Sequence, residues 1–359
     1  MSFLGHLPGS SRGFRQQSMS NLHRNARLLA VTAVVTIGGV ACGAAAKLSP
    51  SPSPKHAGTP APSAPPAPAP TAAPLSAPFI IQVENLNAAR PQSGLSTADI
   101  VYEYETEGGI SRFSAIFFQP PTATVGPVRS ARLVTIRLVD VYDGTLVYSG
   151  GSNYVVATLV DSNVRQYDET SAQGALFRVN SRFAPHNLYT DGSHFAPLAQ
   201  RVGPHTVSYQ LWNRTSQLAL PPGGTPMPKF SVPVSDSENP SYAYDTATGG
   251  YQRTEPDTGV LTDNDTRAPW EPKTIIVLPV AVTQGPEIES GCCTYGLDFG
   301  LVSSGQGQLA IGGQLYPISF TQPGKGPPSI SLANGAPAPV APGQVLVELV
   351  KAGRSVSAG

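Results

Sequence analysis

The chain has 359 residues, with 23 lysine and arginine side chains against 23 aspartate and glutamate side chains. This length allows two or three domains and is sufficient for a real hydrophobic core. The first 42 residues hold four arginines and no acid, so the remainder carries 19 basic against 23 acidic side chains, a balance of about −4. General nucleic-acid binding needs a basic face, and this composition argues against it.

Residues 1–42 have the pattern of a signal peptide. A basic stretch precedes an apolar run from Leu28 to Ala46, and a small residue precedes Cys42 within that run. The pattern is typical of a bacterial lipobox with lipidation at Cys42, although Gly39 stands where such boxes usually carry leucine. The alternatives are an uncleaved membrane anchor of about 18 residues and a disordered cytoplasmic segment. The first two interpretations place the body of the protein at the outer face of the cytoplasmic membrane, outside the cytoplasm.

Residues 43–78 are predicted to be a disordered, Pro-rich linker. From Ser49 to Pro78 the chain is almost entirely serine, proline, alanine and threonine. Such a stretch cannot bury a core, and it favours polyproline II at ~3.1 Å per residue. We expect a tether that holds the folded body away from the membrane; a ligand for a proline-binding module is the alternative.

Residues 79–220 are predicted to form an α/β domain, a mixed sheet with helices packed on it. Residues 98–105 place Ile100, Tyr102 and Tyr104 on one face and Val101, Glu103 and Glu105 on the other, as a strand does. A glycine turn and a second apolar stretch follow, so residues 98–119 are predicted to be a hairpin.

A helix, a strand and a second helix should follow the hairpin. Apolar residues spaced as on a helix run from Val134 to Tyr142, residues 145–149 form an apolar strand, and a Gly-Gly-Ser-Asn turn at residues 150–153 opens a short helix. This alternation is the α/β signature. A crossover of this type puts ligands at the carboxyl ends of the strands, where the loop 120–130 would lie.

Residues 229–352 are predicted to form a small, mainly antiparallel β domain after a Pro/Gly-rich break at residues 220–228. Short strands separated by glycine and asparagine turns recur over residues 242–244, 274–282, 309–311, 315–320 and 345–350.

The segment from Val125 to Arg132 carries the first candidate site. A Gly-Pro turn leads into Arg129 and Arg132, which bracket Ser130 at the predicted helix start. Ser130 as an N-cap, flanked by two arginines at the positive end of a helix, favours an anion such as phosphate or carboxylate. The alternative is a rim network, in which these arginines and Arg112 pair with acids of the neighbouring hairpin. Those acids are Glu103, Glu105 and Glu107.

The second candidate is the loop that carries Asn180, Arg182, His186 and Asn187. A histidine beside an asparagine on a proline-fixed loop suits acid/base chemistry or hydrogen bonding to a sugar or phosphate. The alternative is a loop whose polar side chains satisfy backbone groups. Residues 150–152, a glycine turn before a helix, are a weaker third candidate.

Several motifs together resemble one family. They are ADIVYE (98–103), EGGISRF (107–113), GPVRSAR (126–132), APHNLY (184–189) and RPQSGL (90–95). These motifs resemble the bacterial YerB-like lipoproteins, a family that carries a domain of unknown function in an N-terminal and a C-terminal part. The resemblance covers roughly residues 79–350 and is looser in the C-terminal half, where Phe320 stands at a position at which tryptophan is common. It implies an exported, lipid-anchored envelope protein and supplies no mechanism.

Familiar catalytic motifs are not visible in the sequence: there is no GxSxG elbow, P-loop, HExxH or CxxC. We therefore predict no catalytic residue, no cofactor and no metal site, and leave open whether the protein is an enzyme. Cys292 and Cys293 are adjacent, and a vicinal disulfide, pairing between molecules and two ordinary cysteines all stay open.

The sequence thus predicts an exported, membrane-anchored envelope protein that binds an anionic or glycan ligand, or a protein partner. The candidate ligand-binding residues are Arg112, Arg129, Ser130, Arg132, Asn180, Arg182, His186 and Asn187. One alternative is a metal-assisted enzyme that acts on a phosphorylated envelope glycan or lipid intermediate. Another is a scaffold that works through its β domain.

Overall fold

The computed structural model describes residues 74–214, 218–289, 294–301 and 303–359. The predicted signal or anchor with Cys42, the tether up to residue 73, and the pair Cys292 and Cys293 lie outside the described residues. Among the helices that are described, none is long and apolar enough to cross a membrane.

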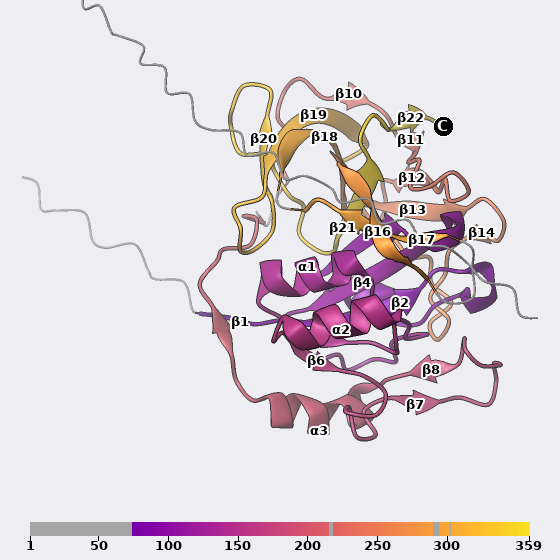
Figure 1. Ribbon diagram of the computed structural model, residues 1–359. Helices are drawn as coiled ribbons and strands as arrows, with labels where there is room; N and C mark the ends of the chain where they lie inside the picture. Colours follow the sequence, from indigo (N-terminus) through magenta and orange to yellow (C-terminus); the bar gives the residue numbers. More distant parts are fainter. Residues whose placement is uncertain (1–73, 215–217, 290–293, 302) are drawn as a thin grey trace, which may run out of the picture. The chain divides into compact units, whose positions relative to one another are not determined.

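A mixed sheet of 11 strands organises the described chain (Figure 1). Its strands in spatial order are β10 (Thr225–Pro226), β19 (Gln314–Thr321), β18 (Ser304–Ile311), β15 (Thr274–Val280), β21 (Val345–Lys351), β3 (Ile100–Glu105), β4 (Ser111–Phe117), β2 (Phe79–Glu84), β5 (Thr145–Val147) and β6 (Arg165–Tyr167), with β20 (Ser329–Leu332) paired to β19. The sheet therefore takes strands from both halves of the chain.

Six strands, which are β15, β21, β3, β2, β5 and β6, run in one direction, and β19 shares it because β18 is antiparallel to both β15 and β19. β2 is parallel to β5 and β5 to β6, while β21 is parallel to both β3 and β15. β4 runs antiparallel to both β2 and β3, which brings the two parallel groups into the same orientation. The carboxyl ends of the six strands consequently share one edge of the sheet. The hairpin predicted over residues 98–119 is confirmed, with Ile100 opposite Ile116 and Glu105 opposite Ser111.

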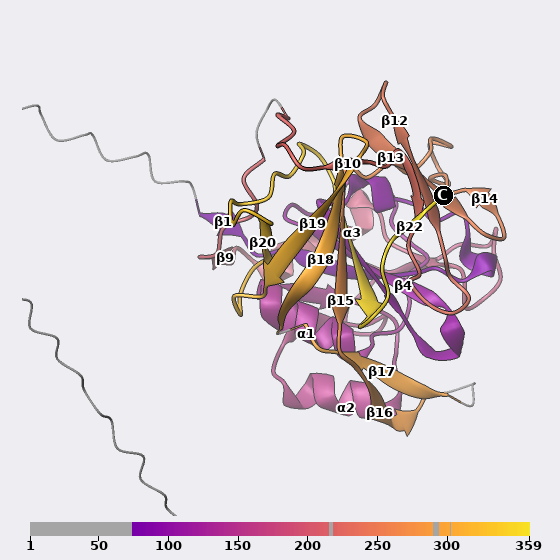
Figure 2. The same cartoon turned by 90° about the horizontal axis from the view of Figure 1, so that it is seen from above.

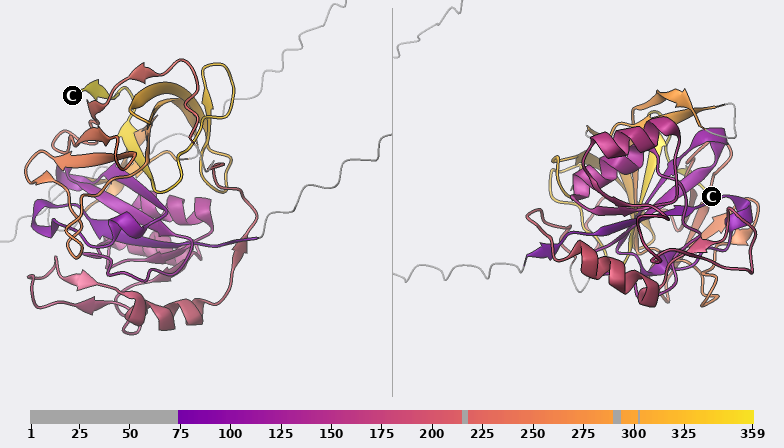
Figure 3. Two further views of the ribbon diagram at one scale, coloured as in Figure 1. Left: turned by 180° about the vertical axis from the view of Figure 1, so that it is seen from behind. Right: turned by 60° about the horizontal axis from the view of Figure 1, so that its bottom comes forward.

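Helices cover both faces of the sheet. The α-helices in the described part of the chain are α1 (Leu133–Tyr142), α2 (Asn153–Asp161) and α3 (Gly192–Val202), and the 3₁₀ turns are η1 (Asn87–Ala89), η2 (Leu95–Thr97) and η3 (Glu107–Gly109). Ile100 and Tyr102 pack in the core with α1 and α2, whereas Val101 packs in the core with α3. The alternation predicted for this strand is confirmed. Figure 3 shows α1 and α2 next to each other and α3 apart from them.

A second sheet of five strands packs against the core that contains α3. Its order is β14 (Gly259–Val260), β13 (Gly250–Glu255), β12 (Ser241–Asp245), β11 (Lys229–Ser231) and β22 (Ser357–Ala358). Three two-stranded ribbons complete the fold: β16 (Val282–Ile288) with β17 (Tyr295–Phe299), β7 (Phe177–Arg178) with β8 (Leu188–Tyr189), and β1 (Leu75–Ser76) with β9 (Thr206–Val207). The ribbon β16–β17 lies beside α2, as Figure 2 shows.

A buried ionic cluster lies between the two sheets. Arg253 of β13 has no exposed surface and donates to both carboxylate oxygens of Glu103 on β3. Its Nε donates to Glu255 at 2.7 Å. Glu348 of β21 lies opposite Glu103 in the parallel register and accepts a hydrogen bond from the Tyr242 hydroxyl. Polar groups thus occupy the centre of an otherwise apolar interface.

The predicted fold class needs a correction. The mixed sheet with packed helices is present, but the described chain is mostly β, so α/β describes little beyond the segment from β2 to α2. Strands β15, β18, β19 and β21 of the predicted β domain belong to the same sheet as β2 to β6. The local patterns placed a strand in each of these four segments without revealing which strands pair across the chain. The predicted boundary between residues 79–220 and 229–352 stays a prediction.

Candidate anion-binding site

Residues 125–131 run along the carboxyl ends of β2 and β5. The amide of Glu84 donates to the carbonyl of Pro127, and the amide of Arg129 donates to Gln82, both at 3.0 Å. On the other side, the amide of Ser149 donates to the carbonyl of Arg129 at 3.0 Å. The segment therefore continues the sheet between β2 and β5, at the edge where the crossover topology predicted it.

Helix α1 begins later than predicted. Its N-cap is Arg132, whose amide donates to the Thr135 hydroxyl at 3.0 Å, so Ser130 is not the cap. The physical reason is that Ala131 still pairs with the extended chain, donating to the Gly150 carbonyl at 3.0 Å. Ser130 instead presents its carbonyl oxygen to Arg112 Nη1 at 3.0 Å.

Arg112, at the start of β4, is 2% exposed. Its Nε has no hydrogen-bond partner, and no ion pair joins it to a carboxylate in the described ranges. Burial, together with the charge of Arg132, lowers the pKa of Arg112 to about 10, which leaves it charged at neutral pH. We call Arg112, Arg129 and Arg132 the arginine cluster. A buried charge without an ionic partner is costly, so the Arg112 guanidinium is the least satisfied group of the arginine cluster.

Arg132 is paired, by contrast. Its Nε donates to Glu107 Oε2 at 2.7 Å, and its Nη2 donates to the other carboxylate oxygen. Burial opposes ionisation of Glu107, but the hydrogen bonds and charge of Arg132 outweigh it and lower the pKa of Glu107. For this arginine the structure shows the predicted pairing with the hairpin acids.

The two candidate segments meet on Glu84, the last residue of β2. Its 1%-exposed carboxylate accepts from Arg129 Nε at 3.0 Å and faces His186 Nδ1 at 2.8 Å. Sequence reasoning missed Glu84 because it ends a buried apolar strand. Glu84 lies directly opposite Arg112 in the β2–β4 register. This position would have identified it as a partner of the arginines, but it can be recognised only when the pairing of β2 with β4 is known.

The rest of the second candidate does not join the cluster. Arg182 donates to the carbonyls of Ala89 and Pro91, each at 2.7 Å. Asn187 donates to the Val179 carbonyl at 3.1 Å, and Asn180 is exposed. The bonds of Arg182 and Asn187 match the alternative interpretation of a loop that satisfies backbone groups, and of that loop only His186 reaches the arginines through Glu84.

Helix α2 begins where predicted, at the same edge of the sheet. Ser152 is its N-cap and accepts from the amide of Val155 at 3.4 Å. The amide of Tyr154, also in the first turn of α2, donates to Glu287 Oε2 at 2.5 Å. Glu287 and the buried Glu289 come from the ribbon β16–β17, so two carboxylates from distant sequence lie against this helix start.

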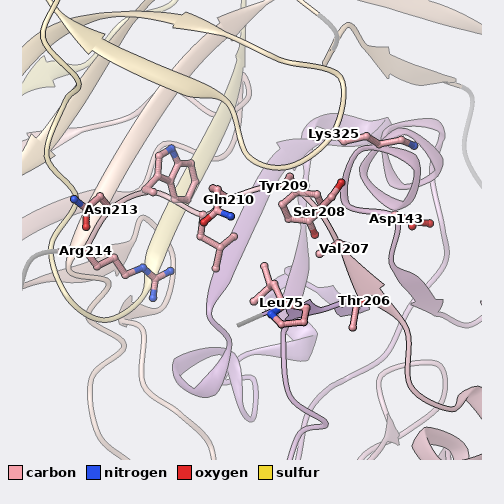
Figure 4. Close-up of a pocket in the computed structure, with 13 residues that line it drawn as sticks. Leu75, Asp143, Thr206, Val207, Ser208, Tyr209, Gln210, Asn213, Arg214 and Lys325 are labelled. Atoms are coloured by element: carbon pink, nitrogen blue, oxygen red, sulfur yellow. The ribbon is translucent and has the colours of Figure 1, made fainter. Parts of the chain in front are cut away.

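Other possible sites lie apart from this cluster. Within the described ranges, no group of three or more His, Cys, Asp or Glu side chains is arranged to hold a metal ion. A groove of about 1080 Å³ is lined by residues 206–214 together with Leu75 and Lys325 (Figure 4). None of the eight predicted ligand-binding residues lines that groove.

Comparison with models of known protein families identifies the family of this chain. Residues 67–205 match the family model described as "Protein of unknown function (DUF3048) N-terminal domain", and residues 230–347 match the C-terminal domain model of the same family. The chain belongs to this family, which confirms the YerB-like resemblance.

One curated relative and one solved structure are similar to this chain. "Putative lipoprotein YerB" of Bacillus subtilis (strain 168) is 32% identical over 209 residues, which span 56% of this chain and 61% of the relative. A crystal structure of the YerB protein from Bacillus subtilis superposes with a TM-score of 0.62 at 26% identity, covering 79% of this chain and 94% of that one. The sequence alignment thus spans less than two thirds of the curated relative.

Proposed function

We propose that this protein is a lipid-anchored, extracytoplasmic envelope protein that binds an anionic group, a phosphate or a carboxylate, at Arg112, Arg129 and Arg132. The observation that carries the proposal is the buried guanidinium of Arg112, which has an unpartnered Nε and no ion pair within the described ranges. An oxyanion would supply both the missing charge and the missing acceptor.

The surroundings of Arg112 support the same ligand chemistry. The cluster lies at the carboxyl ends of parallel strands, which is the usual ligand position in such sheets. Helix α2 starts beside it, and a helix N-terminus adds amide donors and a partial positive charge.

Binding of inorganic phosphate to the full-length chain, measured by isothermal titration calorimetry, tests the ligand. Arg129→Gln removes a 24%-exposed arginine side chain of the cluster, and we expect about 10- to 100-fold weaker binding, the worth of one charge-assisted hydrogen bond. Arg165→Gln removes a partly exposed arginine at the amino end of β6, at the opposite edge of the sheet, where it pairs with Asp143, and serves as the control. Equal affinities for wild type and Arg129→Gln, with the melting temperature of the variant lowered, would assign the arginines to a purely structural network.

The anchor is tested separately. Cells that express the wild-type chain should incorporate labelled palmitate into the protein, and the Cys42→Ala variant should lose the label. An unlabelled wild-type chain of full mass in the membrane fraction would instead identify an uncleaved anchor.

A further inference from the structure

The ribbon β16–β17 places an acidic side chain inside the arginine cluster. We call this ribbon the acidic hairpin, for its residues Glu287 and Glu289. Glu289 follows β16 and is 4% exposed. It lies so close to Gly296 on β17 that a Cβ atom there would come within 2.8 Å of its Oε1. The ribbon therefore turns this carboxylate away from solvent and toward the body of the protein.

The neighbours of Glu289 are the groups that a bound oxyanion would use. Its Oε2 is 3.9 Å from Arg132 Nε, the hydroxyl of Ser152 hydrogen-bonds it, and the charge of Arg112 acts on it. Burial, reinforced by the nearby charge of Glu107, raises the pKa of Glu289 despite these partners. The carboxylate is consequently held in this position at a cost to its ionisation.

Glu287 repeats the arrangement one step along the ribbon. Its carboxylate accepts the amide of Tyr154 in the first turn of α2, a position where helices bind phosphate groups. The acidic hairpin thus occupies both the helix start and the arginine side of the cluster. It leaves Arg112 unsatisfied, because the Nε of that residue still has no partner. A phosphate has more acceptor oxygens and more charge than a carboxylate, and would reach Arg112 as well.

We infer that Glu289 is a built-in occupant of the oxyanion position, and that a phosphate-type ligand binds there by displacing the acidic hairpin from Arg132 and Ser152. This inference rests on the proposed function. It adds that the site is self-occupied without ligand, so affinity is set by a competition within the chain. The base of the hairpin stays in place in this exchange, held by Arg137 Nε on Asp298 at 2.6 Å and by the buried Phe299.

Two measurements on the full-length chain test the competition. In phosphate titrations, Glu289→Gln should bind about 10-fold tighter than wild type, because a charged competitor is removed. The matched control Asp140→Asn removes an acid that is paired with Lys325 on the surface near the far end of α1, and it should bind as wild type does. Hydrogen exchange of residues 285–289 in the wild-type chain should rise on saturation with phosphate, while that of residues 282–284 at the base stays unchanged. A rise in exchange shows displacement of the hairpin, which a change in affinity alone does not show.

The outcomes separate this inference from the proposed function. Phosphate binding by wild type with no tightening in Glu289→Gln, or with unchanged exchange in the acidic hairpin, overturns the inference alone. No phosphate binding by any variant overturns the proposed function and the inference with it. Should Glu289→Gln fold poorly, the wild-type exchange measurement decides by itself. Repeating the titration with glycerol 3-phosphate distinguishes the two sources of the phosphate group. Tighter binding of glycerol 3-phosphate than of inorganic phosphate indicates an esterified phosphate as the ligand, and the reverse indicates free phosphate; both results support the assignment of an oxyanion site.

Discussion

Glu348→Gln should lower the free energy of unfolding at pH 7 by no more than about 1 kcal/mol, the worth of one neutral hydrogen bond, and it raises that free energy to the extent that wild type loses stability through the raised pKa of Glu348. Glu103→Gln, one strand away, should cost about 3–5 kcal/mol, the usual penalty for breaking a buried ion pair. Both residues belong to the buried ionic cluster, both have no exposed surface, and they are opposite each other in the β21–β3 register. The substitutions are chemically identical, so the difference isolates the charge state of each carboxyl.

The structure assigns those charge states. Burial opposes ionisation of Glu103, but the charge and hydrogen bonds of Arg253 outweigh it and lower its pKa. Burial and the charge of Glu103 raise the pKa of Glu348 well above its usual range, which favours its neutral form. Glutamine reproduces a neutral Glu348, whereas at Glu103 it leaves Arg253 without the carboxylate that takes two of its hydrogen bonds.

The pH dependence follows from the raised pKa of Glu348. Its neutral form contributes stability that is complete below the unfolded-state pKa of about 4.3, and this contribution is lost as pH rises through the folded-state pKa. Urea unfolding from acidic to alkaline pH should therefore show that Glu348→Gln becomes steadily more stable relative to wild type as pH rises. An equal loss of stability in the two variants at pH 7, or a pH slope unchanged by Glu348→Gln, would refute this assignment.

Two further substitutions test the local geometry by thermal unfolding. Gly126→Ala should lower the free energy of unfolding by about 2–4 kcal/mol, because the added Cβ would come within 2.6 Å of the Tyr189 ring at a positive φ. The control Gly174→Ala, also at positive φ but with nothing within 4 Å, should lose only about 1 kcal/mol. Similar losses in the two variants would contradict the role of packing at Gly126. Asp191→Ala should cost about 1 kcal/mol at neutral pH because Asp191 caps α3. Burial slightly opposes ionisation, but bonds from His194 and Ser193 lower the pKa of Asp191 to about 2, so the cap should persist until pH falls toward that value, and early loss near pH 4 would count against it.

Patterns within short stretches were readable from the sequence. The two-residue period of residues 98–105 and the glycine turn after it predicted the β3–β4 hairpin, because both depend only on neighbouring residues. The Gly-Gly-Ser-Asn turn likewise predicted the start of α2. The start of α1 was misplaced at Ser130, since the pairing of Ala131 with Gly150 depends on where β5 ends.

Partners across long sequence distances were not readable. The alternative interpretation of a rim network paired Glu103 and Glu105 with the arginine segment, but β13 brings Arg253 to Glu103, and the end of β21 brings Lys351 to Glu105. Only Glu107 pairs with Arg132 as expected. Glu289 gave no signal, because its place in the cluster depends on a ribbon that the sequence did not connect to α2.

The position of β21 has a consequence for how the protein is made. This strand follows both β3 and β15 in the sequence, yet it lies between them and pairs with both. During synthesis, β3 and β15 therefore each keep one open edge until β21 has been made. Unpaired edges of this kind invite pairing with other chains. A nascent or truncated chain that stops before Val345 should thus be a client for chaperones, with a large share of its secondary structure formed and its main sheet still in two pieces.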